Sequence, residues 1–149
     1  MTSTSNIQNH SNAVHQLRQE QLKTSTREFK ARGSALKRCP KCLLAESKCI
    51  CDTFEPIDSQ IGVCMLMYHA EYYKPSNTGQ LICQLVKDNF AFRWERTEVD
   101  PALVALLQEP KWYPVIIFPH DNVEQDRQLD ALPRAQILNG RRPLFIFLD

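Results

Sequence analysis

The feature that most constrains the fold is a series of four short apolar segments separated by helical or polar sequence. These segments are residues 61–68, 90–94, 115–118 and 144–148. The first and the last are continuous apolar runs, typical of strands buried on both faces. In the second, Phe90, Phe92 and Trp94 alternate with other residues, as in a strand. Strands that alternate with helices predict an α/β fold with a mostly parallel sheet and right-handed crossovers.

Helix signals fall between these predicted strands. Ser76 or Asn77 can cap a first helix. Asp100 followed by Pro101 is a typical start of a second helix, and Pro110 should end it. Residues 121–129 are predicted to form a short polar helix. The inner face of the first helix is predicted to consist of Leu81, Ile82, Leu85 and Val86.

Residues 1–38 are basic, with seven Lys/Arg against Glu20 and Glu28, whereas residues 39–149 carry a net charge of −4. Residues 1–11 are rich in Ser, Thr and Asn and are expected to be disordered. A marginal helix is expected from Asn12 to about Arg32. Its cations can contact RNA phosphates, or they can form an ordinary solvated helix face.

Four cysteines within residues 39–58 follow the spacing C-x2-C-x6-C-x-C: Cys39, Cys42, Cys49 and Cys51. Four thiolates match the tetrahedral shell of a structural zinc ion, provided that the chain turns at Ile50. Arg38, Lys41 and Lys48 can offset the negative charge of such a site. The alternative is a set of free or redox-active thiols. Cys64 and Cys83 lie in apolar segments and are expected to be core residues.

A dense polar segment, residues 68–81, follows the first predicted strand. Ligands of open α/β sheets bind at the carboxyl ends of strands, and free N–H groups at 77–79 can hold a phosphate or carboxylate. The alternative is an ordinary capped turn with a strand-end histidine, His69. Arg93 can bind an anionic substrate or pair with Glu95 or Glu98. The predicted polar rim also includes Arg96, His120, Asp121 and Asp149.

Several classes of protein are excluded. No apolar run approaches the roughly 18 residues that cross a bilayer. G-x-G-x-x-G, Walker and G-x-S-x-G motifs are absent, so the common dinucleotide, nucleotide triphosphatase and hydrolase sites lack their signatures. The first residues contain no continuous apolar segment, so we expect no secretory signal and a reducing, cytoplasmic location.

We also expect the chain to be the truncated front of a longer domain, because its last strand lacks a covering helix.

Together, the four cysteines, the stretch 74–79, the Phe118-Pro119 step and residues 144–149 resemble the DTW-domain family of bacterial tRNA-uridine aminocarboxypropyltransferases. The resemblance runs from about Val14 to the last residue. Asp149 matches the aspartate of the family's Asp-x-Thr-Trp motif. The threonine and tryptophan of that motif, and a later Ser-Thr-x-Glu-Ala motif, are missing from the sequence.

The resemblance implies a SPOUT-like fold, incomplete here, and transfer of the 3-amino-3-carboxypropyl group from S-adenosylmethionine to N3 of a tRNA uridine. It makes residues 59–149 the N-terminal part of the DTW domain, preceded by the zinc unit 39–58 and the basic segment 1–38. Asp149 becomes the candidate catalytic base. The candidate cofactor or substrate contacts are His69, Glu71, Lys74, Asn77, Thr78, Gly79 and Arg93.

Two other functions remain open at this point. A non-catalytic, zinc-containing RNA-binding module needs only the cysteine unit and the basic segment. A thiol redox protein would use Cys39 and Cys42, although nothing suggests that they lie between a strand and a helix as in thioredoxin. Zinc content separates the redox protein from the others, and binding of S-adenosylmethionine separates the transferase from the RNA-binding module.

Overall fold

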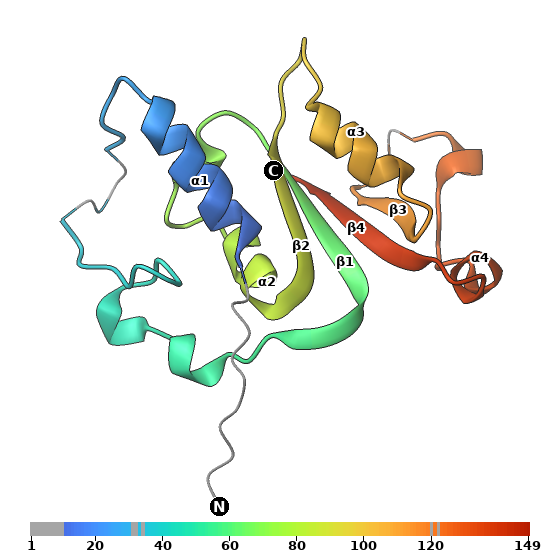
Figure 1. Cartoon of the computed structure of the whole chain (residues 1–149), viewed down its shortest axis with the longest axis horizontal. Coiled ribbons are helices and arrows are strands. Elements are labelled where there is room, and N and C mark those ends of the chain that lie inside the picture. The colour runs from blue at the N-terminus through green and yellow to red at the C-terminus, as the bar shows by residue number, and fades with distance from the viewer. Residues whose placement is uncertain (1–10, 31–32, 34, 120, 122) are drawn as a thin grey trace, which may run out of the picture.

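The computed structural model describes residues 11–30, 33, 35–119, 121 and 123–149. In this part of the chain, the centre of the molecule is a sheet of four strands (Figure 1). The strands are β1 (Ile57–Met67), β2 (Val86–Arg93), β3 (Trp112–Ile117) and β4 (Arg142–Leu148). They lie in the order β2-β1-β4-β3, and every neighbouring pair is parallel. The expected α/β class with a parallel sheet is therefore confirmed.

Helices lie on both faces of this sheet, and the alternation of side chains along β1 separates two cores. Val63, Met65 and Met67 belong to the core that includes residues of α1 (Ala13–Thr24) and α2 (Gly79–Leu85). Cys64 belongs to the second core, against α3 (Pro101–Gln108). A parallel strand between helical layers must be apolar on both sides, as the continuous run in β1 predicted.

The N-terminal helix is shorter than predicted. Asn12 caps α1 by accepting hydrogen bonds from the N–H groups of Val14 and His15, and Ser25 after its end is extended. Val14 and Leu17 are buried, so this helix is part of the fold. The expectation of disorder in residues 1–11 falls almost wholly outside the described residues.

The helix that follows β1 differs from the prediction in its cap and its inner face. Thr78 occupies the N-cap position without a side-chain cap, and the Asn77 side chain instead accepts from the Gly79 N–H. Gln80 and Cys83 are the buried residues of α2, because it packs against α1 as well as the sheet. The predicted inner positions Leu81, Ile82 and Leu85 are only half-buried, and Val86 begins β2.

The other connections confirm one helix and correct another. Asp100 caps α3 with Pro101 in its first turn, as predicted. In the described part of residues 121–129, by contrast, the regular structure is of the 3-10 type, at Asp121 and at Gln125–Arg127, and the α-helix before β4 is α4 (Arg134–Leu138). Residues 121–129 contain several charges and few apolar groups, so little burial stabilises a longer helix.

Within the described ranges, no helix combines the length and the apolar character that crossing a membrane requires.

Gly62 of β1 packs closely against the residues beneath it. A Cβ atom built there would lie 2.7 Å from Cη2 and 2.8 Å from Cζ3 of Trp112, and 3.0 Å from Cδ1 of Leu144. Trp112 is fully buried, and Phe90 packs edge-on against its ring at a centroid distance of 6.1 Å. The indole therefore occupies the space that any side chain at position 62 would need.

We predict that Gly62→Ala lowers the free energy of unfolding by about 1–3 kcal/mol, the usual cost of overpacking a core. Urea denaturation measures this change. The double variant Gly62→Ala/Trp112→Phe removes the ring atoms nearest the new methyl group. It should lose less than the sum of the two single variants. Simple additivity of the two losses would contradict the proposed contact.

Candidate functional site

The four clustered cysteines converge in three dimensions. Their Sγ atoms all lie within 4.8 Å of one another, with Cys39 to Cys51 at 3.6 Å and Cys42 to Cys49 at 3.9 Å. Zn–S bonds of about 2.3 Å in a tetrahedron place sulfurs about 3.8 Å apart. The arrangement therefore fits a metal ion such as zinc with four protein ligands, which leaves no open coordination position.

Local backbone structure explains why the sulfurs meet. The Leu43 N–H donates to the Cys39 carbonyl at 2.9 Å, and the Cys39 N–H donates to the Leu44 carbonyl at 2.9 Å. Leu43 has a φ of 57°, the left-handed geometry that tight turns use. Ile50, with φ −117° and ψ 7°, provides the predicted turn between Cys49 and Cys51. Both pairs can thus present sulfur to a common centre.

The thiols of this unit differ in acidity when no metal is bound. Backbone N–H groups of Cys42 and Lys41 stabilise the thiolate of Cys39 and lower its pKa to about 6. Burial, with the neighbouring sulfur of Cys39, raises the pKa of Cys51 to about 12. At pH 7 Cys39 is therefore largely ionised while Cys51 keeps its proton. A metal ion would have to displace that proton on binding.

The remaining two cysteines behave as the sequence predicted. Cys64 and Cys83 are fully buried in the cores on the two faces of the sheet. Burial raises the pKa of each thiol to about 12. Protonated, enclosed thiols of this kind are unreactive packing groups.

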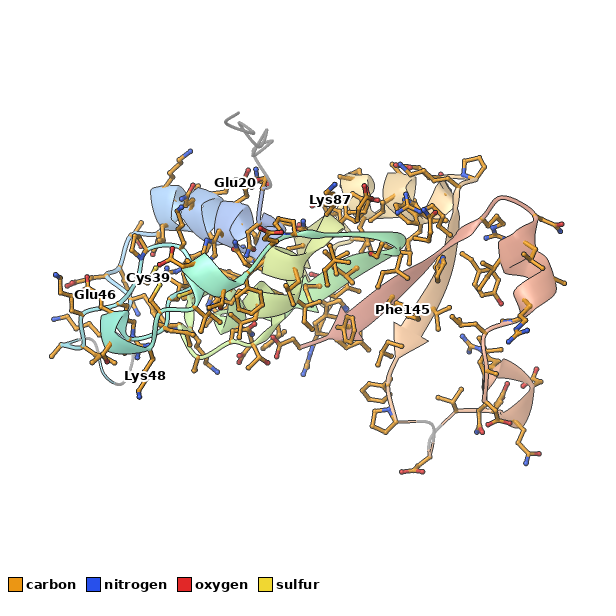
Figure 2. All side chains as sticks on the ribbon, turned by 90° about the horizontal axis from the view of Figure 1, so that it is seen from below. Glu20, Cys39, Glu46, Lys48, Lys87 and Phe145 are labelled. Atoms are coloured by element: carbon orange, nitrogen blue, oxygen red, sulfur yellow. The ribbon has the colours of Figure 1, made fainter. Side chains whose placement is uncertain are left out.

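A buried hydrogen-bond network joins the cysteine unit to α1 and α2. The Gln80 side chain donates to the Cys42 carbonyl at 2.6 Å, and its oxygen lies 2.7 Å from Nε2 of His15. Asn12 donates to the Gln80 carbonyl at 2.8 Å. Gln80 is only 2% exposed. The network therefore holds the cysteine unit, which Figure 2 shows around Cys39, Glu46 and Lys48, against the helix that begins at the polar segment.

The polar segment after β1 and the end of β4 line an open cavity of about 400 Å³, a size suited to a small-molecule ligand. It lies at the carboxyl ends of β1 and β4, where the sequence placed a ligand site. Six predicted site residues line it: Glu71, Lys74, Asn77, Thr78, Gly79 and Asp149.

Backbone hydrogen bonds fix Asp149 at the edge of the sheet. Its N–H donates to the Leu66 carbonyl at 3.0 Å, and its carbonyl accepts from the Tyr68 N–H at 2.9 Å. The Asp149 carboxylate accepts a hydrogen bond from the Asn77 side-chain amide. A carboxylate and an amide thus meet across the cavity mouth, although 72 residues separate them in sequence.

Asn77 also shapes the turn that leads into α2. Its backbone N–H donates to the Lys74 carbonyl at 3.1 Å, and its side-chain oxygen accepts from the Gly79 N–H at 2.9 Å. A Cβ atom at Gly79 would lie 3.0 Å from that oxygen and 3.2 Å from Sδ of Met65, so a side chain fits poorly. The expectation of free N–H groups at 77–79 is therefore wrong for Asn77 and Gly79, because the turn uses both.

Charge at the cavity comes from one lysine and two acids. Lys74 Nζ lies 2.5 Å from Glu71 Oε1, and both residues belong to the cavity wall. Glu71 is in the 3-10 turn η3 (Glu71–Tyr73), which follows the left-handed residue Ala70. The pair offers an ammonium and a carboxylate side by side, which is complementary to an amino-acid group.

Two predicted residues do not line the cavity. His69 is exposed and is not among the lining residues. Arg93 forms an ion pair with Glu95 at 2.6 Å and donates to the Gln21 side chain at 3.4 Å. The alternative of surface pairing with Glu95 therefore describes the geometry of Arg93.

Sequence reasoning missed the apolar part of the cavity and one hydroxyl. These residues are Met65, Ser76, Ile82, Phe147 and Leu148. A signal for Met65 was present, because odd-numbered positions of β1 share the face that the following helix covers. The approach of Phe147 from β4 depends on strand order, which local patterns do not specify.

We predict that the chain binds one zinc ion through the cysteine unit, and that Cys49→Ser lowers zinc affinity strongly. Binding displaces protons from thiols such as Cys51, so apparent affinity should fall by roughly tenfold per pH unit for each displaced proton as pH is lowered. Metal analysis and competition with a chromophoric chelator measure both effects. Cys64→Ala is the matched control and should retain the zinc. If Cys64→Ala lost the zinc while Cys49→Ser kept it, the assignment would be contradicted.

The likeness of this chain to known proteins is found at the level of a family. No solved structure matches it. The family model of the DTW domain matches residues 36–149, which include the cysteine unit, the cavity and all four strands. The chain therefore belongs to the DTW-domain family, the family of the tRNA-uridine aminocarboxypropyltransferases, and this membership supports a role in tRNA modification.

Proposed function

We propose that this protein transfers the 3-amino-3-carboxypropyl group of S-adenosylmethionine to N3 of a uridine in tRNA. The observation that carries the proposal is the cavity in the DTW domain where Asp149, Asn77 and the Glu71–Lys74 pair meet. It combines a proton acceptor, a positioning amide and a pair of opposite charges with an apolar floor. The remainder of the fold holds these groups at one edge of the sheet.

The proposed reaction needs a base more than it needs a nucleophilic side chain. The positive sulfur of S-adenosylmethionine already activates the neighbouring methylene carbon. Asp149 would accept the N3 proton of the uridine as N3 forms a bond to that carbon. The carbon–sulfur bond breaks, and its electron pair leaves on the sulfur as a neutral thioether. The hydrogen bond from Asn77 supports this role because it orients the carboxylate.

The other lining residues would bind the donor. Lys74 would meet the α-carboxylate of the transferred group, and Glu71 would meet its α-ammonium, so that their mutual ion pair would be exchanged for two ligand contacts. Thr78 lies at the cavity wall as a further polar contact, and the small size of Gly79 keeps the floor open over Met65. His69 and Arg93, which lie outside this cavity, are proposed only as contacts to the RNA.

The proposed organisation has three parts: a basic segment (1–38), a structural zinc unit (39–58) and a catalytic domain that begins at residue 59. A SPOUT-like arrangement of the catalytic domain is part of this proposal. A reducing compartment such as the cytoplasm would keep the four thiols available to zinc. The principal alternative, a non-catalytic RNA-binding module, would use the first two parts without the cavity.

We predict that Asp149→Asn in the full-length protein lowers kcat by at least about 100-fold, as loss of a general base does. The substitution keeps the shape of the side chain, so binding of S-adenosylmethionine should change little. Transfer of label from donor to tRNA and calorimetry of donor binding measure the two quantities. The exposed Asp130→Asn is the control. Full activity of Asp149→Asn would remove the assignment, and absence of donor binding by the unaltered protein would favour the RNA-binding module.

The basic segment gives a second prediction. Deleting residues 1–38 would also remove Val14, Leu17 and the Asn12 cap, which the fold uses, so charge substitutions are the cleaner test. Lys23 and Arg27 are exposed and form no ion pair within the described residues. Lys23→Gln/Arg27→Gln should weaken tRNA binding and reduce the slope of log K against log salt by about 1 for each phosphate that is no longer bound. An unchanged slope would exclude binding of phosphates by these two side chains.

A further inference from the structure

Two large aromatic side chains lie exposed against each other at the carboxyl edge of the sheet. Tyr68 directly follows β1 and Trp94 directly follows β2, and their ring centroids are 5.7 Å apart with an interplanar angle of 50°. Tyr68 is 47% exposed and Trp94 is 43% exposed. We call these two residues the edge pair.

Core packing does not account for the edge pair. Phe90 and Phe92 of β2 already pack against the core beneath α3. Trp94 lies two residues after Phe92, beyond the end of the strand. Within the described residues, neither the Tyr68 hydroxyl nor the Trp94 indole N–H forms a hydrogen bond. Aromatic residues with an unused polar atom and an exposed ring are typical of binding surfaces.

The edge pair is attached directly to the candidate site. The Tyr68 N–H donates to the carbonyl of Asp149 at 2.9 Å, and the Trp94 N–H donates to the carbonyl of Met67 at 2.9 Å. Alternation along β1 places Tyr68 on the α3 side of the sheet, whereas Met65 faces the cavity on the α2 side. The edge pair and the cavity therefore lie on opposite sides of the same sheet edge. The backbone of Asp149 lies at that edge, between the two surfaces.

Positive charge lies on both sides of this sheet edge: α1 packs on the α2 side, opposite the edge pair, and Arg96 follows Trp94 in the chain. The hydrogen bond from Arg93 to Gln21 brings the last turns of α1 to the carboxyl end of β2, and Figure 1 shows α1 running beside this strand. The segment that leaves α1 carries Lys23 and Arg27, both exposed. Arg96, two residues beyond Trp94, is exposed and has no ion-pair partner in the described part of the chain.

We propose that the edge pair is a stacking platform for an unpaired base of the RNA substrate, the base that flanks the target uridine. The proposal rests on the proposed function, which places the uridine in the cavity across the sheet edge. Exposed aromatic rings beside cations are the combination that binds single-stranded RNA, because rings stack on bases while cations contact the backbone. A strand that crosses the edge would place one base on the rings and its neighbour at Asp149.

Substitution and fluorescence test this platform in the full-length protein, with an unmodified tRNA transcript as the probe. Trp94→Ala and Tyr68→Ala should each raise the Kd for the transcript by about 5- to 150-fold, the range found for loss of base stacking. Trp94→Phe keeps a ring and should retain most of the affinity. Trp112 is fully buried, so RNA should quench the fluorescence of Trp94 selectively, and Trp94→Phe should abolish the quenching.

Phe118→Ala is the matched control, because Phe118 is an aromatic residue just beyond β3 that is more exposed than the edge pair and has no ring partner among the described residues. Its Kd should not change, and an equal loss in this control would overturn the proposal. Absence of quenching at saturating transcript would also overturn it, even if an alanine variant failed to fold. Quenching without any transfer activity would refute the proposed function and leave the platform standing. Transfer activity with an unchanged KM for tRNA in both alanine variants would support the proposed function and refute the platform.

Discussion

The parallel pairing of β1 on both of its edges is the constraint on which the rest of this structure depends. Gly62–Leu66 pairs with residues 144–148 of β4 while the same stretch pairs with residues 88–92 of β2. Because all three strands run in one direction, their last residues reach a common edge. Asp149, the polar segment after β1 and the end of β2 meet there for this reason. The chemistry of the site therefore follows from strand direction and register.

A second constraint is the burial of Gln80. A side-chain amide enclosed by protein costs free energy unless its donors and acceptor are satisfied, and here the Cys42 carbonyl and His15 satisfy them. The same residue lies in α2, immediately after Gly79 of the cavity wall. One amide thus couples the position of the cysteine unit to the turn that holds Asn77. A metal ion bound by that unit would therefore stabilise the cavity wall from a distance.

The sequence predicted those features that local patterns encode. Four apolar runs became four strands, Asp100-Pro101 began a helix, and the spacing of Cys39, Cys42, Cys49 and Cys51 anticipated their convergence. Each of these signals lies within a few residues of the chain. The polar segment was also recognised, because Glu71, Lys74 and Asn77 lie in the short connection between β1 and α2.

The features that escaped prediction depend on contacts between distant residues. Gln80 is buried because α1 covers it, and its partner Cys42 lies 38 residues away. Phe147 lines the cavity because β4 inserts between β1 and β3, an order that four similar apolar runs leave open. The pairing of Arg93 with Glu95 was one of two interpretations that the sequence allowed, and geometry selected it. Helix limits were wrong where few apolar groups were available, as in residues 121–129.

The alternation that separates the two cores also divides the sheet edge into two surfaces. On the α2 side the edge is hollow and polar, with Asp149 and Asn77 at its mouth; on the α3 side it is aromatic, formed by Tyr68 and Trp94. In our proposals a small, charged donor would occupy the first surface, and a flat, stacking base would bind to the second. Since backbone hydrogen bonds tie Asp149 to Leu66 and Tyr68, the pairing of β4 with β1 sets the position of Asp149 relative to both surfaces. An enzyme that must align a small molecule with one base of a large RNA gains from this coupling, because the relative placement of its two substrates is set by a single strand pairing.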